Sequence, residues 1–271
     1  MCGALWSAAL SLSPAVYAPS VHPRSADHAL LLAHLPPMLC SFRRSCFAQS
    51  WEQFAGPLAV LETLSGRFAQ SAAREIKRAA DTILAPVVRE VVRGAMDGAS
   101  YDLDEAAFTL CEARDPWAKF LTEQLFNLDV VRTFERLCSL SAFADLVCAL
   151  ASVLVGFVEE GFVNALPISV YGAIQVEREV RVLERAVQAQ LSHCAERSAP
   201  GDGDEAQLVR SAFAARTRNV QGHFARLRHF AHVLNVEHPS DLEREETCFP
   251  HAPALSAEEV QRVLAMRSGF D

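Results

Sequence analysis

The chain has 271 residues, of which 51% are hydrophobic, and its 25 basic and 33 acidic side chains give a net charge of −8. That hydrophobic content suits a buried core and excludes a disordered chain. The acidic balance, with no basic stripe, argues against nucleic acid as a partner. Eight cysteines without a CxxC pair or zinc-finger spacing predict reduced, buried thiols in a cytosolic protein.

The first part of the chain, residues 1–50, is expected to be an irregular, proline-containing segment with one short helix over residues 26–35. Its first twenty residues are apolar enough to suggest a signal peptide as an alternative. They lack the positively charged start that a signal peptide carries, which favours an irregular segment of the protein over a signal peptide.

Helical spacing begins at Trp51, where apolar residues start to recur three and four positions apart, as on one face of a helix. This pattern predicts helix over residues 51–84, a break at Pro86, and helix again over residues 87–94. The acidic stretch over residues 97–114 is expected to be partly loop.

Asp115, Pro116 and Trp117 predict the start of the next helix. Asp can cap the free N–H groups, and proline fits the first helical position because its missing N–H would be unpaired there. Trp117 is expected to anchor the core, with a binding hot spot as the alternative.

The stretch Leu137–Val158 is the most apolar part of the chain, with Asp145 as its only charged residue. A membrane span needs about 20 apolar residues, and an Asp near its centre opposes insertion. We interpret this stretch as a buried core helix and keep a transmembrane helix as the alternative.

A further amphipathic helix is predicted over residues 176–191, after a short connection that contains Gly172. Gly172 is expected to serve either a positive-φ turn or a close approach of another segment. A polar loop, SAPGDGD at 198–204, separates this helix from the next. The charged residues of the helix are expected to form a solvated face, with a partner surface as the alternative; they are Arg178, Glu179, Arg181 and Glu184.

The final helix is predicted to start with Ser256 as N-cap and Glu259 three residues later, the pattern of a capping box. No run alternates with period two for long enough to predict a sheet. The predicted fold class is therefore all-α, a stack of antiparallel helices over residues 51–271.

Motifs of enzymes and phosphate-binding proteins are absent from the sequence, so no catalytic residue or cofactor is predicted. The histidines within His223–His238 raise the alternative of a metal-dependent helical enzyme. Because no carboxylate or cysteine at helical spacing completes a ligand set, we predict no metal site.

Four stretches in order resemble the C-terminal region of subunit 4 of the conserved oligomeric Golgi complex. They cover residues 101–125, 171–183, 223–237 and 255–271. The residues that match the family pattern include Glu112, Ala113, Asp115, Pro116, Trp117, Gly172, Gln175, Glu179, Phe224, Arg226, Leu227, Asn235, Leu255, Glu259, Val263 and Arg267. Family members are much longer, so the chain is expected to be a shortened relative or a partial gene model.

This resemblance implies a helical rod of the multisubunit tethering type, without catalytic activity. It implies a peripheral protein on the cytosolic face of the Golgi membrane that supports retrograde intra-Golgi transport. The implied partners are the other subunits of the complex, Golgi SNAREs and Sec1-type regulators.

Arg226 is the most informative single residue, because it is charged and lies beside an apolar helical stripe. A guanidinium among apolar neighbours needs a partner. We predict an ion pair between Arg226 and Glu259, with one carboxylate oxygen on Arg226 and the other on the backbone of Ser256. The alternative is a solvated Arg226, with Glu259 acting only as a cap.

Overall fold

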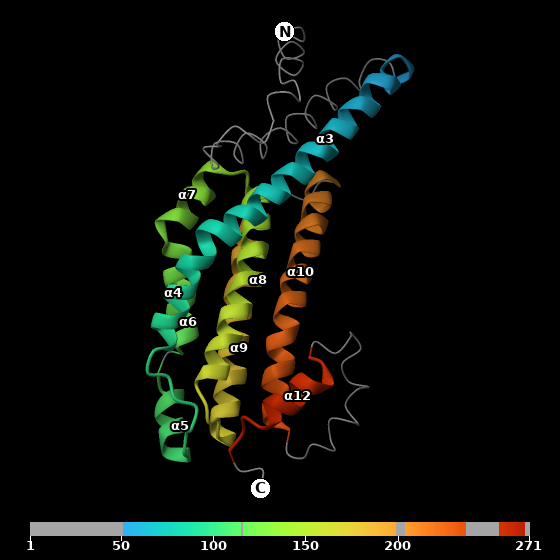
Figure 1. Ribbon diagram of the computed structural model, residues 1–271. Coiled ribbons are helices and arrows are strands. Elements are labelled where there is room, and N and C mark those ends of the chain that lie inside the picture. The colour runs from blue at the N-terminus through green and yellow to red at the C-terminus, as the bar shows by residue number, and fades with distance from the viewer. Residues whose placement is uncertain (1–50, 115, 199–203, 237–254, 269–271) are drawn as a thin grey trace. The chain divides into compact units, whose positions relative to one another are not determined.

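The computed structural model describes residues 51–114, 116–198, 204–236 and 255–268 (Figure 1). Within these ranges the chain is helical apart from short connections, and the predicted all-α class is confirmed. The described part contains no β-strand, only a single parallel bridge between Ile168 and Arg267. The segment predicted to be irregular, residues 1–50, lies outside the described residues.

Two compact units make up the chain, Met1–Glu75 and Ile76–Asp271. The boundary between them falls inside α3 (Trp51–Ala79). The domain boundary expected at residue 51 stays a prediction, because the residues before it are not described.

The helix break predicted at Pro86 is wrong. Helix α3 continues through a π-helical turn, η2 (Ala80–Leu84), directly into α4 (Ala85–Met96), whose first turn contains Pro86. Proline disrupts a regular helix because it lacks an N–H and its ring meets the carbonyl four residues earlier. The wider π turn, in which the Ala85 N–H bonds to Ala80 O, relieves this conflict before Pro86.

Three short helices follow: α5 (Glu105–Glu112), α6 (Trp117–Asn127) and α7 (Asp129–Leu137). The structure places Pro116 at the N-cap of α6 with an extended conformation, so the prediction that Pro116 is the first helical residue is wrong by one position. Asp115, the predicted cap, lies outside the described residues.

The longest helices of the second unit run alternately up and down beside one another (Figure 1). They are α8 (Leu140–Asn164), α9 (Val170–Ser198) and α10 (Asp204–Asn235). Helix α10 packs on both α8 and α9, α4 packs on α8 and α6, and α6 packs on α9. The helices α8 and α9 therefore form the middle of this unit, and α12 (Ala257–Leu264) packs on α10.

Helix α8 is long and apolar enough to cross a membrane, but 61% of its most apolar stretch is buried among the other helices. Its one charged residue before Glu159, Asp145, forms an ion pair of 2.7 Å with Arg216 of α10. This packing favours the core-helix interpretation of Leu137–Val158. The helix itself begins later than that range, because Ser139 caps it by accepting a hydrogen bond from the Ala142 N–H.

The solvated face predicted for α9 is wrong for two of its four charged residues. Glu179 and Glu184 are only 2% and 9% exposed, whereas Arg181 stays exposed and pairs with Glu177. The four described cysteines are free thiols, as predicted, but among them Cys194 is the only one that is fully buried.

Candidate functional site

An aromatic cluster joins helices that are far apart in the sequence. Phe162 of α8 is fully buried at its centre. It meets Tyr101 edge-on at 5.5 Å, Trp117 at 6.2 Å and Phe230 of α10 at 6.0 Å between ring centroids. We call these four residues the aromatic junction. Trp117 is half-buried within it, at the position of the predicted core anchor.

A chain of hydrogen bonds leads from the aromatic junction into α9. Trp117 Nε1 donates to the Tyr101 hydroxyl at 2.8 Å, and Tyr101 donates to Glu179 Oε2 at 3.3 Å. Gln175 Nε2 donates to Glu179 Oε1 at 2.5 Å. Because buried polar groups are costly without partners, this arrangement fixes the relative positions of the residues that form it.

Burial dominates the electrostatics of this network. It raises the pKa of Glu179 to about 8, although hydrogen bonds from Gln175 and Tyr101 oppose the shift. Burial and the nearby Glu179 carboxyl likewise raise the pKa of the Tyr101 hydroxyl. The raised pKa favours the protonated form of Glu179, which suits an interior position better than a carboxylate does.

Gly172 lies where the chain of residue 101 crosses the first turn of α9. A Cβ at this position would lie 1.8 Å from Tyr101 O, closer than any real contact. The Gly172 N–H donates to Ser169 Oγ at 3.1 Å, and the Ser169 N–H donates to the same Tyr101 O. Of the two interpretations offered for Gly172, the close approach holds, and a positive φ does not.

Arg178, the neighbour of Glu179, holds the end of α5. Its guanidinium donates to the carbonyls of Cys111 at 3.2 Å, Glu112 at 3.4 Å and Arg114 at 3.4 Å. Carbonyls at a helix C-terminus carry partial negative charge and lack partners within the helix. The guanidinium therefore adds donors at the end of α5, where the Cys111 carbonyl also accepts from the Arg114 N–H at 3.2 Å.

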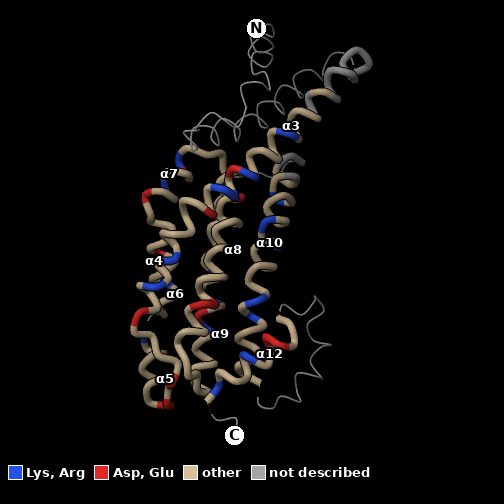
Figure 2. Tube along the Cα trace, viewed as in Figure 1, with Lys and Arg blue, Asp and Glu red and all other residues tan. Residues whose placement is uncertain are grey.

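A second polar site, the Arg226 cluster, joins α8, α10 and α12. Arg226 Nε and Nη2 lie 2.7 and 2.8 Å from the two carboxylate oxygens of Glu159. Arg226 Nη2 also lies 2.6 Å from Glu259 Oε1. Figure 2 shows basic positions on α10 beside an acidic segment of α12. Arg226 thus bridges two carboxylates, of which the sequence pointed to only one.

Glu259 uses its two oxygens for different partners. Oε1 accepts from Arg226, and Oε2 accepts from the Ser256 N–H at 2.7 Å, while Ser256 Oγ accepts from the Glu259 N–H. The capping box and the ion pair therefore occur together. The hydrogen bond from Arg226, followed by that from Ser256, lowers the pKa of Glu259 to about 2.

The two polar sites are neighbours along the same helices. Glu159 precedes Phe162 by three residues on α8, and Arg226 precedes Phe230 by four on α10, so each pair shares a helix face. Sequence reasoning missed Glu159, Tyr101 and Phe162. For Glu159 a signal existed, because its spacing from Phe162 places a carboxylate on the buried stripe at the end of the apolar run.

The histidines considered as an alternative metal site do not share one site in the structure. His229 Nδ1 accepts from the Leu255 N–H at 3.2 Å, and burial lowers the pKa of both His229 and His223. His238 lies outside the described residues. Within the described ranges, no group of three His, Cys, Asp or Glu side chains is placed to hold a metal ion.

Contacts between the four family-like stretches extend beyond these two sites. Asn235 Nδ2 donates to Ala173 O at 3.1 Å, which ties the third stretch to the second. Arg267 donates to Val236 O, which ties the fourth to the third. With the Tyr101–Glu179 hydrogen bond between the first and second, all four stretches meet in one folded region.

Comparison with known families agrees with this arrangement. The sequence model described as conserved oligomeric Golgi complex subunit 4, C-terminal, matches residues 41–265, which is most of the chain. A search of curated proteins returned no significant match. The chain belongs to the family of the C-terminal region of subunit 4 of the conserved oligomeric Golgi complex, a vesicle-tethering complex of the Golgi.

Proposed function

We propose that this chain is a non-catalytic, protein-binding part of the Golgi tether that supports retrograde intra-Golgi transport. The observation that carries the proposal is the family match over residues 41–265. The packing supports the proposed function. Within the aromatic junction, and within the Arg226 cluster, side chains from several helices contact one another. Such sites hold helices rigidly, and rigid helices can present side chains to several partners.

The proposed partners are the other subunits of the complex, Golgi SNAREs and Sec1-type SNARE regulators. In this role the chain associates with the cytosolic face of the Golgi membrane as a peripheral protein. Binding, and not bond chemistry, is the proposed activity. The site residues proposed to support it structurally are Trp117, Gly172, Arg226, Ser256 and Glu259, together with Asp115 as predicted from the sequence.

The test is affinity purification of the tagged full chain from cells, followed by identification of the bound proteins. The control bait is an unrelated helical protein of similar size and net charge. We expect other subunits of the Golgi complex, or Golgi SNAREs, with the chain and not with the control. Recovery of neither class, with the bait intact and abundant, contradicts the proposed function and leaves the fold unaffected.

The second candidate function is that of a membrane-spanning protein, because α8 is long and apolar enough to cross a membrane. Carbonate extraction distinguishes the two candidates. A peripheral protein is released into the supernatant at high pH, whereas a spanning helix keeps its protein in the membrane pellet. We expect release, because Asp145 and Glu159 of α8 are held by Arg216 and Arg226 of α10.

A further inference from the structure

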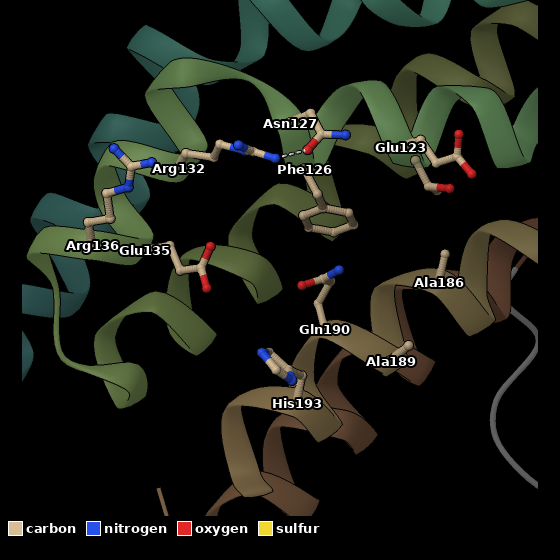
Figure 3. A pocket seen from close by; sticks show the side chains of 11 residues that line it. Glu123, Phe126, Asn127, Arg132, Glu135, Arg136, Ala186, Ala189, Gln190 and His193 are labelled. Atoms are coloured by element: carbon tan, nitrogen blue, oxygen red, sulfur yellow. Dashed lines mark hydrogen bonds between the residues drawn. The ribbon is translucent and has the colours of Figure 1, made fainter. Parts of the chain in front are cut away.

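A groove with a volume of about 650 Å³ lies between α9 and the bend that joins α6 to α7 (Figure 3). Helix α6 ends at Asn127 and α7 begins at Asp129, so the two short helices are separated by a single residue. The Phe126 ring and the Gln190 amide point toward each other across this space. The groove is lined only by residues of the second unit and lies apart from the aromatic junction and the Arg226 cluster.

The floor of the groove suits close packing of another helix. Helix α9 contributes Ala186, Ala189 and Gln190 to it, at spacings that place them on one face of the helix. Two alanines leave room for a neighbouring axis at about 8–10 Å, the usual separation of packed helices. The walls are helices whose backbone groups are paired internally, so they offer no free edge to an extended peptide. Recognition here must therefore use side chains.

Charge is distributed unequally along the groove. Arg132 and Arg136 of α7 lie at one end, and Glu123 of α6 lies at the other (Figure 3). Glu135, the carboxylate nearest the two arginines in sequence, is paired with Arg197 at 2.8 Å. Among the residues that the structure describes, the Arg132 side chain donates only to the neutral amide oxygen of Asn127.

The charged groups at the two ends are available to a ligand. Arg136 and Glu123 are exposed, and neither forms an ion pair with another residue of the described ranges. One end of the groove therefore presents net positive charge, and the other end presents a carboxylate. Such an arrangement selects the partner and its register more than it adds affinity.

We propose that this groove docks one amphipathic α-helix of a partner protein. The helix carries acidic residues at the end that meets Arg132 and Arg136, apolar residues against Phe126 and Ala189, and a basic residue opposite Glu123. This inference rests on the proposed protein-binding function and names the surface and the kind of segment that it binds. The feature that selects the partner is a helix with acidic residues at one end and a basic residue at the other.

Two synthetic helical peptides of identical composition test this proposal with the full chain. The first has its acidic residues at one end and its basic residues at the other, and the second has the same residues with the charges alternating. We expect the first to bind the chain about tenfold more tightly than the second, since only it can satisfy both ends of the groove at once. Added salt should reduce this difference.

A matched pair of variants locates the binding. Ala189→Trp places a large side chain on the groove floor, whereas Ser192→Trp adds the same side chain at another exposed position of α9 that does not line the groove. We expect Ala189→Trp to abolish binding of the first peptide and Ser192→Trp to preserve it. Because both positions are exposed, we expect both variants to keep the wild-type helix content. Circular dichroism measures this content.

Charge reversal tests the selectivity directly. In the double variant Arg132→Glu/Arg136→Glu, the first peptide should lose its advantage, and a third peptide with lysines in place of the acidic block should gain it. Equal binding of the first two peptides, binding that survives Ala189→Trp, or absence of binding by any peptide overturns the groove proposal. Because affinity purification does not depend on these peptides, it tests the proposed function independently of the groove proposal.

Discussion

The Tyr101 hydroxyl donates to Glu179 Oε2 at 3.3 Å across 78 positions of sequence, while its own oxygen accepts from Trp117 Nε1 at 2.8 Å. One oxygen atom thereby connects the loop before α5, the first turn of α6 and the buried side of α9. Because Tyr101 is 1% exposed, water cannot replace either hydrogen bond without entering the core.

Replacing this hydroxyl should therefore destabilise the protein. Tyr101→Phe keeps the ring against Phe162 but leaves the Trp117 N–H without its acceptor and Glu179 without one donor. We expect the free energy of unfolding to fall by about 1–3 kcal/mol, the range for buried polar groups left unpaired. Urea denaturation followed by circular dichroism measures it.

Tyr171→Phe is the control for this variant. The Tyr171 ring packs on Phe108 at 5.5 Å, and its hydroxyl makes no hydrogen bond to another described residue. The same atom is removed there without loss of a buried contact, so stability should stay nearly unchanged. Equal effects of the two substitutions would contradict a special role for the Tyr101 hydroxyl.

Glu179 should give stability a dependence on pH. Its pKa is raised from an ordinary value of 4.5 to about 8 by burial, so the folded state holds a proton that the unfolded state releases above pH 4.5. Its contribution to stability is therefore fully present below pH 4.5 and is lost as the pH rises to about 8. The slope contributed by one such group is at most about 1.4 kcal/mol per pH unit.

Glu179→Gln removes this titration and keeps a neutral side chain of similar shape. Unfolding free energies of wild type and variant, measured between pH 4.5 and 8, should diverge, with the wild type losing stability relative to the variant as the pH rises. Parallel curves across this range would show that Glu179 is ionised in the folded protein.

Gly172 should not tolerate a methyl group. In Gly172→Ala the new Cβ would lie 1.8 Å from Tyr101 O, a backbone atom that cannot move without breaking its hydrogen bond from Ser169. We expect a loss of about 1–3 kcal/mol, as for other overpacked interior positions. Thermal denaturation should show a lower melting temperature than for the wild type.

Gly156→Ala provides the matched comparison. Gly156 also lies within a helix, but no atom of another segment lies within 4 Å of the position that a Cβ would take. Alanine is favoured over glycine inside helices by about 0.5–1 kcal/mol, so this variant should be slightly more stable than the wild type. Opposite signs for Gly172 and Gly156 are the expected result, and a stabilising Gly172→Ala would refute the close approach.

The helical periods and the family-like stretches were sufficient to predict the fold class, because amphipathic spacing is a local property. The error at Pro86 arose because a π turn relieves proline strain without leaving a pattern in the sequence. The charged run of α9 was misread for a related reason. Its four residues differ in surroundings according to which helices cover them, and helix packing is not a local property.

The polar sites were partly predictable. Arg226 and Glu259 could be paired because both lie at family-like positions and a guanidinium beside an apolar stripe needs a carboxylate. Glu159 belongs to α8, 67 residues before Arg226, and only the packing of α8 on α10 brings the two together. The Tyr101–Glu179 contact has the same origin, since neither residue has a spacing that points to the other.

The Arg226 cluster gives the last prediction. The Arg226 and Glu159 side chains are 36% and 19% exposed, so this pair lies between an exposed and a buried ion pair. Arg226→Ala should destabilise by roughly 1–2 kcal/mol, less than the loss expected for a fully buried pair. The double variant Arg226→Ala/Glu159→Gln should lose less stability than the sum of the two single variants, because the residues contact each other directly.

Glu259→Gln separates the ion pair from the helix cap. Glutamine can still accept from the Ser256 N–H, so the capping box persists while the charge toward Arg226 is lost. This variant should lose less stability than Glu159→Gln, because Glu159 makes two hydrogen bonds to Arg226 and Glu259 makes one. Additive unfolding free energies for Arg226→Ala and Glu259→Gln would show that Glu259 acts only as a cap.

Acid titration provides an independent test of the same pair. The pKa of Glu259 is lowered from 4.5 to about 2, first by Arg226 and then by Ser256, so the folded state favours the ionised carboxylate. Its stabilising contribution is present above pH 4.5 and is lost as the pH falls toward 2. Over that range the wild type should lose stability more steeply than Glu259→Gln. In the Arg226→Ala background this difference in slope should shrink, because the main cause of the low pKa is gone; an unchanged difference would assign the low pKa to Ser256 alone.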